Sequence, residues 1–266
     1  MRIRTAVPWA AAPLAFAVAA AGQAREERPP MSERAAAVAL MDDRISPERD
    51  QALRLATELG PLASADLKVA VIEAAWAELR GETNRPEGSE AIFDYVWAVA
   101  RLRDPGAIEF MIAALGTGTG IPNGLADLGS AAFPAVLSAV KNPAGFPLDV
   151  RGGLMALRFM VEDGSLNGRQ LEQVREAVRE RLSEPQDPKV ANGAVRLAVV
   201  LGDRELRQTV ETIATDRTTA EAFVSPYLSD GVTRSRSYQR RVDGVQAEAR
   251  LFLSGGGADV GPFRWK

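Results

Sequence analysis

One pattern repeats along most of this chain. A Ser or Asp, often followed by Pro, precedes a run whose apolar residues recur every three or four positions; the run from Ser46-Pro47 through Leu53 and Ala56 to Gly60 is an example. A Ser or Asp side chain caps a helix by accepting a backbone N–H, and Pro fits the first helical turn because no donor is needed there. Spacings of three and four place apolar residues on one helical face. The pattern predicts an all-α fold.

The same pattern predicts further helices along the chain. They begin at Ser64, Ser89, Asp104, Ser130, Asp187 and Asp203, lie around Leu125, and cover residues 148–161 and 171–182. No segment before residue 216 alternates apolar and polar residues with the β-branched enrichment typical of a strand. The connections between the helices are short, as in antiparallel bundles and in helical solenoids.

Internal similarity favours the solenoid. Several helices end in Leu followed closely by Gly or Asp, in Leu102-Arg103-Asp104-Pro105, Leu128-Gly129-Ser130-Ala131 and Leu201-Gly202-Asp203. These turns resemble the Leu-Gly-Asp-Pro turn of the HEAT-repeat family, and residues 128–137 carry the resemblance most fully. The resemblance covers roughly residues 46–215 and implies a right-handed α-α superhelix of about four to five helix pairs. Spacings of 43, 26 and 73 residues separate Leu59, Leu102, Leu128 and Leu201, against about 40 in the family, so the repeats are degenerate.

Residues 1–24 are predicted to be a secretory signal peptide. Two arginines precede an uncharged stretch over residues 5–24, and the small residues Gly22 and Ala24 stand before a cleavage point at Arg25. An uncleaved membrane anchor is the alternative, although two prolines leave an apolar stretch shorter than the roughly 20 residues of a spanning helix. We therefore expect the protein to be exported, either to the periplasm or out of the cell.

The mature chain is predicted to have three parts. Residues 25–45 form a leader and a first helix, residues 46–215 form the HEAT-like repeat domain, and residues 216–266 form an irregular C-terminal cap or tail with a short helix near residues 220–224. Terminal units of a solenoid are often atypical because they cap the stack. The aromatic residues Trp76, Phe93, Tyr95 and Trp97 are predicted to lie in the core.

Composition excludes much chemistry. The chain has no His and no Cys, which removes the commonest general base, thiol nucleophiles and the usual ligands of zinc and iron–sulfur clusters. Ser138-Ala139-Val140-Lys141 matches the S-x-x-K motif of penicillin-binding proteins, but the companion motifs are missing. A lysine near a helix C-terminus is the preferred interpretation. No metal site and no cofactor are predicted, and the chain is not expected to be an enzyme.

Two groups of charged residues are candidates for binding. Arg234, Arg236, Arg240 and Arg241 form a basic cluster in the tail, suited to an anionic patch on a partner, whereas Glu176 and Arg179 belong to a helix whose charges alternate in sign. The resemblance implies that second helices, including this one, line the concave face. Both groups are also typical of a solvated surface. The net charge of −3 gives no broad positive field for nucleic acid.

These features predict a non-catalytic scaffold of the bacterial cell envelope. A protein or peptide partner would bind the concave face of the solenoid, which needs no special chemistry. No nucleic-acid partner is expected, and no membrane span after signal cleavage. The alternative is an accessory or catalytic subunit of an envelope enzyme that uses carboxylates, which would require two acids about 5–10 Å apart in a cleft.

Overall fold

The computed structural model describes residues 30–42, 46–83, 92–118, 120–142, 146–224 and 236–256. Over these residues the chain is helical without a β-strand, so the predicted all-α class is confirmed. The predicted signal peptide, Ser89 and Arg234 lie outside the described residues. None of the described helices is both long enough and apolar enough to cross a membrane.

The described part of the chain contains thirteen α-helices and four short 3-10 helices. The α-helices are α1 (Glu33–Met41), α2 (Pro47–Leu59), α3 (Ala65–Leu79), α4 (Ile92–Leu102), α5 (Ile108–Ala113), α6 (Gly120–Asp127), α7 (Phe133–Lys141), α8 (Pro147–Glu162), α9 (Gly168–Ser183), α10 (Pro188–Val200), α11 (Arg204–Thr215), α12 (Arg217–Phe223) and α13 (Arg236–Leu253). The 3-10 helices are η1 (Gly60–Leu62), η2 (Pro105–Ala107), η3 (Leu115–Thr117) and η4 (Gly129–Ala131).

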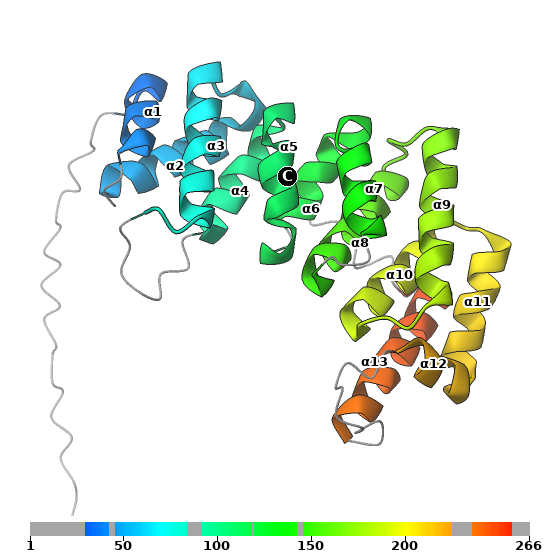
Figure 1. Cartoon of the computed structure of the whole chain (residues 1–266). Coiled ribbons are helices and arrows are strands. Elements are labelled where there is room, and N and C mark those ends of the chain that lie inside the picture. The colour runs from blue at the N-terminus through cyan, green and yellow to red at the C-terminus, as the bar shows by residue number, and fades with distance from the viewer. Residues whose placement is uncertain are drawn as a thin grey trace, which may run out of the picture. The chain divides into compact units, whose positions relative to one another are not determined.

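The helices pack in two rows (Figure 1). In row A, each of α2, α4, α6, α8, α10 and α13 contacts the next member, and in row B the same holds for α1, α3, α5, α7, α9 and α11. Consecutive helices cross from one row to the other, for example α7 against α8 and α9 against α10. Contacts are therefore mainly between neighbours in the chain, and the hydrophobic core lies between the rows.

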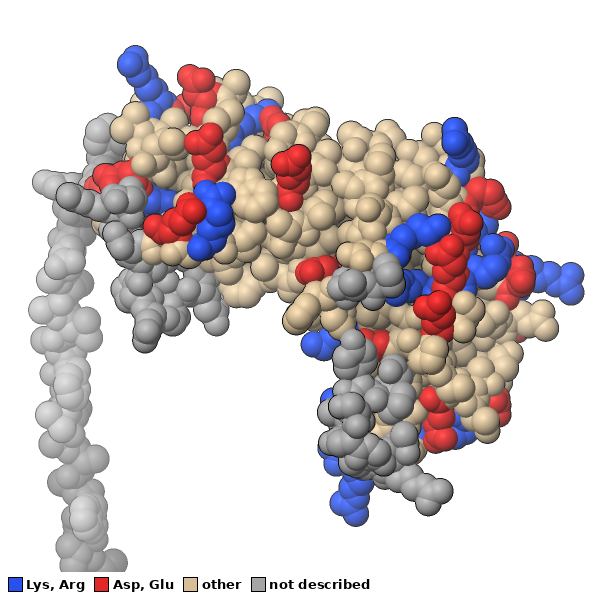
Figure 2. Space-filling model, in the orientation of Figure 1, with Lys and Arg blue, Asp and Glu red and all other residues tan. Residues whose placement is uncertain are grey.

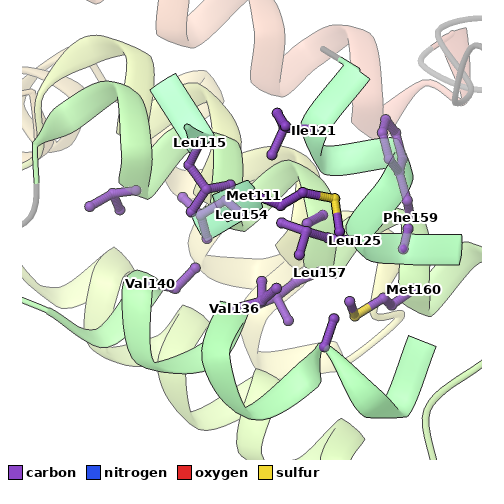
Figure 3. Close-up of a cluster of buried hydrophobic side chains, with 14 of the residues drawn as sticks. Met111, Leu115, Ile121, Leu125, Val136, Val140, Leu154, Leu157, Phe159 and Met160 are labelled. Carbon is purple, nitrogen blue, oxygen red and sulfur yellow. The ribbon is translucent and has the colours of Figure 1, made fainter. Parts of the chain in front are cut away.

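Figure 3 shows this core at the level of α5 to α8. Its labelled side chains are Met111, Leu115, Ile121, Leu125, Val136, Val140, Leu154, Leu157, Phe159 and Met160, all of them buried. Small residues let neighbouring elements pack closely: a Cβ added at Gly152 on α8 would lie 2.6 Å from the carbonyl oxygen of Leu115 in η3, and within row A one at Gly124 on α6 would lie 2.8 Å from the Cα of Ala100 on α4. Such distances leave no room for a larger side chain.

Most of the predicted helix caps are confirmed. The side chains of Ser46, Ser64, Asp104, Asp187 and Asp203 each accept a backbone N–H at the start of the helix that they precede. The predicted cap at Ser130 is wrong, because Ser130 lies inside η4 and α7 begins after Ala132 without a side-chain cap. The backbone makes a 3-10 turn there, with Ala132 N donating to Gly129 O, whereas a capping residue needs extended backbone.

The prediction that residues 216–266 are irregular is wrong for residues 236–253, whereas the short helix predicted near residues 220–224 is confirmed by α12. This segment contains α12 and the 18-residue α13, which packs on α10 and α11 and completes row A. The buried apolar residues of α13 recur every four and three positions, at Tyr238, Val242, Val245, Ala249 and Phe252. The arginines between them obscured this spacing. A polar contact also holds α13 against α11: Gln246 Nε2 donates a hydrogen bond to the carbonyl oxygen of Ile213 at 3.1 Å.

Candidate functional site: a charged groove along row A

Three of the four arginines in the basic cluster predicted for the tail lie on α13. Arg236, Arg240 and Arg241 are exposed, and none of them makes an ion pair with another described residue. Arg236 and Arg240 lie on one side of α13 at the end of row A because residues four positions apart are neighbours on a helix, whereas Arg241 lies about 100° around the helix from Arg240. The structure therefore keeps these three arginines available to solvent or to a partner.

Glu176 and Arg179 lie on α9, in row B. Glu176 is 3.7 Å from the ammonium of Lys141 on α7, and Arg179 is 3.5 Å from Glu205 on α11. Figure 2 shows acidic and basic side chains intermixed over α9. Exposed pairs of this kind contribute about 0–1 kcal/mol each. The structure thus places the two predicted groups on different rows, and it couples Glu176 and Arg179 to the helices beside α9.

The S-x-x-K residues Ser138 and Lys141 lie on α7 and line an open depression of about 850 Å³ between α7 and α9. The Lys141 ammonium is 3.3 Å from Glu180 as well as 3.7 Å from Glu176. Within the described residues no hydrogen bond joins Ser138 to Lys141. These contacts match a solvated helix surface, as the sequence indicated, and do not form a serine–lysine pair.

Sequence reasoning missed a pocket between α8 and α10 that is rich in positive charge. We call it the cationic pocket; it encloses about 200 Å³ and is lined by Arg151, Leu154, Met155, Arg158, Lys189, Asn192, Gly193 and Arg196. Its four cations come in two pairs, and the members of each pair are seven residues apart on one helix. A spacing of seven returns to the same helical face after two turns. The sequence therefore indicates that each helix carries two cations on one face. It does not indicate that α8 and α10 pack together and bring the two pairs into one pocket.

Two of the cations are held in place by acids and aromatic rings. Arg158 is only 4% exposed; its Nε lies 3.7 Å from Glu162, and its guanidinium lies 4.9 Å from the ring centre of Phe159. Burial lowers the pKa of Arg158, and the charge of Glu162 partly offsets that effect. Arg196 Nε donates to Glu248 Oε1 at 2.6 Å. Both guanidinium groups therefore have a fixed orientation before any ligand arrives.

The other two cations are uncompensated. Arg151 and Lys189 are exposed at the rim of the cationic pocket, and neither pairs with an acid among the described residues. Within the described residues, four positive charges thus face two negative ones, Glu162 and Glu248. The Asn192 Oδ1 atom is also buried here without a hydrogen-bond partner in the described structure. An anion would supply the missing negative charge.

The cationic pocket continues along row A. A smaller pocket of about 60 Å³ shares Arg151 and Met155 with it and extends to Gly118 and Pro122 at the start of α6. The chain there approaches α4, because a Cβ added at Gly120 would lie 3.5 Å from Trp97. Neighbouring contacts thus connect α10 to α4 along the surface of row A.

Trp97 also lines a third pocket, between α2 and α4, which we call the acidic pocket. It encloses about 480 Å³ and is lined by Asp50, Leu53, Arg54, Thr57, Glu58, Asp94 and Trp97, so three carboxylates face one arginine. We call the three pockets together the row A groove: the cationic and small pockets share lining residues, and the acidic pocket is linked to them by the approach of Gly120 to Trp97. Its lining is acidic at α2–α4 and basic at α8–α10. The core prediction holds for Tyr95, which is fully buried, but not for Phe93, which is 41% exposed and lies beside Gly118.

Among the described residues, no group of three or more acidic side chains is placed to hold a metal ion. No protein-family model matches the chain, and comparisons with curated proteins and with solved structures likewise find no match.

Proposed function

We propose that this chain is an exported solenoid of HEAT-like type that binds a protein or peptide partner along the row A groove and catalyses no reaction. The observation that carries the proposal is the groove, which follows several helices and has opposite charges at its two ends. Packing in two rows, with contacts mainly between neighbours in the chain, is typical of repeat proteins. The Leu-Gly turns that resemble the HEAT-repeat family support the same proposal.

The chemistry of the groove favours an extended partner. A small molecule would fill one pocket, whereas an extended peptide can contact the acidic pocket, the apolar surface around Pro122 and Met155, and the cationic pocket together. Complementary charges guide such a partner and fix its direction. The matching peptide carries basic residues near α2–α4 and acidic groups near α8–α10.

Export is part of the proposal, and it rests on the basic start, the uncharged stretch and the small residues before Arg25. Sequencing the N-terminus of the protein isolated from cell envelopes tests it. A mature chain that begins at Arg25 is expected. A chain that still begins at Met1 and fractionates with membranes would instead establish the uncleaved anchor.

A crosslinking pull-down from intact envelopes tests the partner. The mature chain, residues 25–266, is compared with the double variant Asp50→Asn/Asp94→Asn, which removes two exposed carboxylates of the acidic pocket. Arg204→Gln serves as the control, because Arg204 is an exposed arginine on row B that makes no ion pair with another described residue. A recurrent protein recovered with the mature chain and the control, and depleted with the double variant, is the expected result. If no protein is captured while a reference complex is, the carboxylate enzyme becomes the better hypothesis.

A further inference from the structure

We propose that the cationic pocket is a binding site for a doubly charged oxyanion, with phosphate as its chemical type. The anion is either a free ion or a phosphate group carried by the partner of the row A groove. The inference rests on the proposed function only for the second source, because binding of inorganic phosphate requires no partner.

The charge balance sets the ligand's charge. Arg151 and Arg158 on α8 face Lys189 and Arg196 on α10, and these helices pack directly against each other. Glu162 and Glu248 neutralise two of the four cations, so among the described residues the pocket has an excess of two positive charges. Like charges held close together repel, and a dianion between them removes that repulsion.

The donors are preorganised for an oxyanion. The guanidinium of Arg158 is fixed by Glu162 and by the rings of Phe159 and Phe252, at 4.9 Å and 5.9 Å from their centres. The guanidinium of Arg196 is fixed by Glu248 and lies 5.4 Å from the Phe252 ring centre. Planar guanidinium groups match the geometry of phosphate oxygens, and fixed groups lose little freedom on binding.

The volume of the cationic pocket suits a small ion or a single phosphate group better than a whole organic molecule. Its volume is about 200 Å³, below the roughly 300–1,000 Å³ typical of pockets for larger ligands. The buried Oδ1 atom of Asn192 is an acceptor, which the O–H of a hydrogen phosphate or a bridging water can satisfy. A tetrahedral oxyanion with a bridging water fits these features, while the apolar side chains of Leu154 and Met155 limit access of bulk water.

Calorimetric titration of the mature chain with inorganic phosphate tests the site, at an ionic strength held constant with sodium chloride. We expect saturable binding and a higher Tm in phosphate than in chloride. Arg151→Gln/Lys189→Gln is expected to weaken phosphate binding at least tenfold, while Arg204→Gln leaves it unchanged. The double variant should fold normally, since both residues are exposed and make no ion pair with described residues.

A second variant separates binding from folding. Lys189 lies in the first turn of α10, where a negative charge favours the helix dipole. Lys189→Glu is therefore expected to fold at least as well as the natural chain and to lose phosphate binding. Absence of saturable binding to the natural chain, or equal affinity in the α8–α10 variants and in Arg204→Gln, would overturn the proposal.

Repeating the pull-down with Arg151→Gln/Lys189→Gln distinguishes a free phosphate ion from a phosphate group carried by the partner. Loss of the partner together with phosphate binding assigns the anion to the partner, and retention of the partner assigns the site to a free ion. The variant Asp50→Asn/Asp94→Asn should keep phosphate binding in either case. Phosphate binding that survives without any captured partner would refute the proposed function while leaving this site intact.

Discussion

Arg196 on α10 and Glu248 on α13 form an ion pair in which Nε lies 2.6 Å from Oε1. Only 26% and 16% of the two side chains are exposed, so the pair is largely removed from water. Through this contact the C-terminal helix fixes one wall of the cationic pocket. The tail is thus part of the same structure as the groove.

Removing the charge of Glu248 should lower the stability of the protein but strengthen its binding of phosphate. In Glu248→Gln the guanidinium of Arg196 loses its counter-charge, so we expect the free energy of unfolding to fall by about 1–3 kcal/mol. The pocket then has one more uncompensated positive charge, and phosphate should bind more tightly. Urea denaturation and phosphate titration measure the two effects. Glu211→Gln is the control, because its ion pair with Arg207 is about half exposed and should contribute little to stability. Weaker phosphate binding by Glu248→Gln would contradict the account.

Truncation before α13 tests whether the tail completes row A. Deleting residues 236–266 exposes the surfaces of α10 and α11 that α13 covers, and terminal units of a repeat protein protect the units beneath them. Hydrogen exchange followed by mass spectrometry should show faster exchange in α10 and α11, with α2 to α4 little affected. Unchanged exchange in α10 would mean that α13 does not stabilise the row.

A pair of glycine substitutions tests the close packing of α8 against η3. Gly152→Ala places a Cβ 2.6 Å from the Leu115 carbonyl oxygen, and such overpacking costs about 1–3 kcal/mol. Gly244 on α13 has no atom within 4 Å of the added Cβ, so Gly244→Ala should stabilise the helix by about 0.5–1 kcal/mol. Thermal unfolding of both variants measures the contrast in sign. Stabilisation by Gly152→Ala would show that α8 and η3 are not packed as described.

Asp216 should give the protein a defined acid sensitivity. Hydrogen bonds from the side chain and backbone of Thr219 lower the pKa of this capping carboxylate below its ordinary value of 3.8. A lowered pKa contributes stability that is present above pH 3.8 and is lost as the pH falls through the folded-state value. Asp216→Asn keeps a capping oxygen but removes the titration.

The difference in unfolding free energy between the natural chain and Asp216→Asn should therefore be constant near neutral pH. As the pH drops below 3.8, the natural chain should lose stability relative to Asp216→Asn. Urea denaturation at a series of pH values measures it. A difference that stays flat through the acid range would contradict the assignment of the shift to the Thr219 contacts.

Local patterns in the sequence predicted the helices well where caps and apolar spacing coincide. Ser64 and Asp203 each begin the expected helix, because a capping side chain acts on residues only two or three positions away. The same rule failed at Ser130, where the backbone continues through a 3-10 turn. It also missed Asn167, which with Gln170 forms a capping box at α9.

The candidate site was beyond local patterns because it depends on which helices pack together. Arg158 and Arg196 are distant in sequence, and only the packing of α8 on α10 brings them to one pocket. Trp97 was predicted to be in the core because its helix is apolar around most of its circumference, yet it lines the acidic pocket. The sequence showed that the arginines of α13 form a charge cluster. It did not show that they lie at the end of row A, because α13 was not predicted as a helix.

Site-specific photocrosslinking in intact cell envelopes tests the central claim, that a partner occupies the row A groove. A photoreactive amino acid is placed at Met155, which lines both the cationic pocket and its continuation toward α6, and in separate variants at Glu176 or Arg204 on row B. We predict that position 155 gives a recurrent crosslink to one protein and that the two row B positions do not. A partner crosslinked from row B but not from position 155 would contradict the assignment of the groove as the binding site.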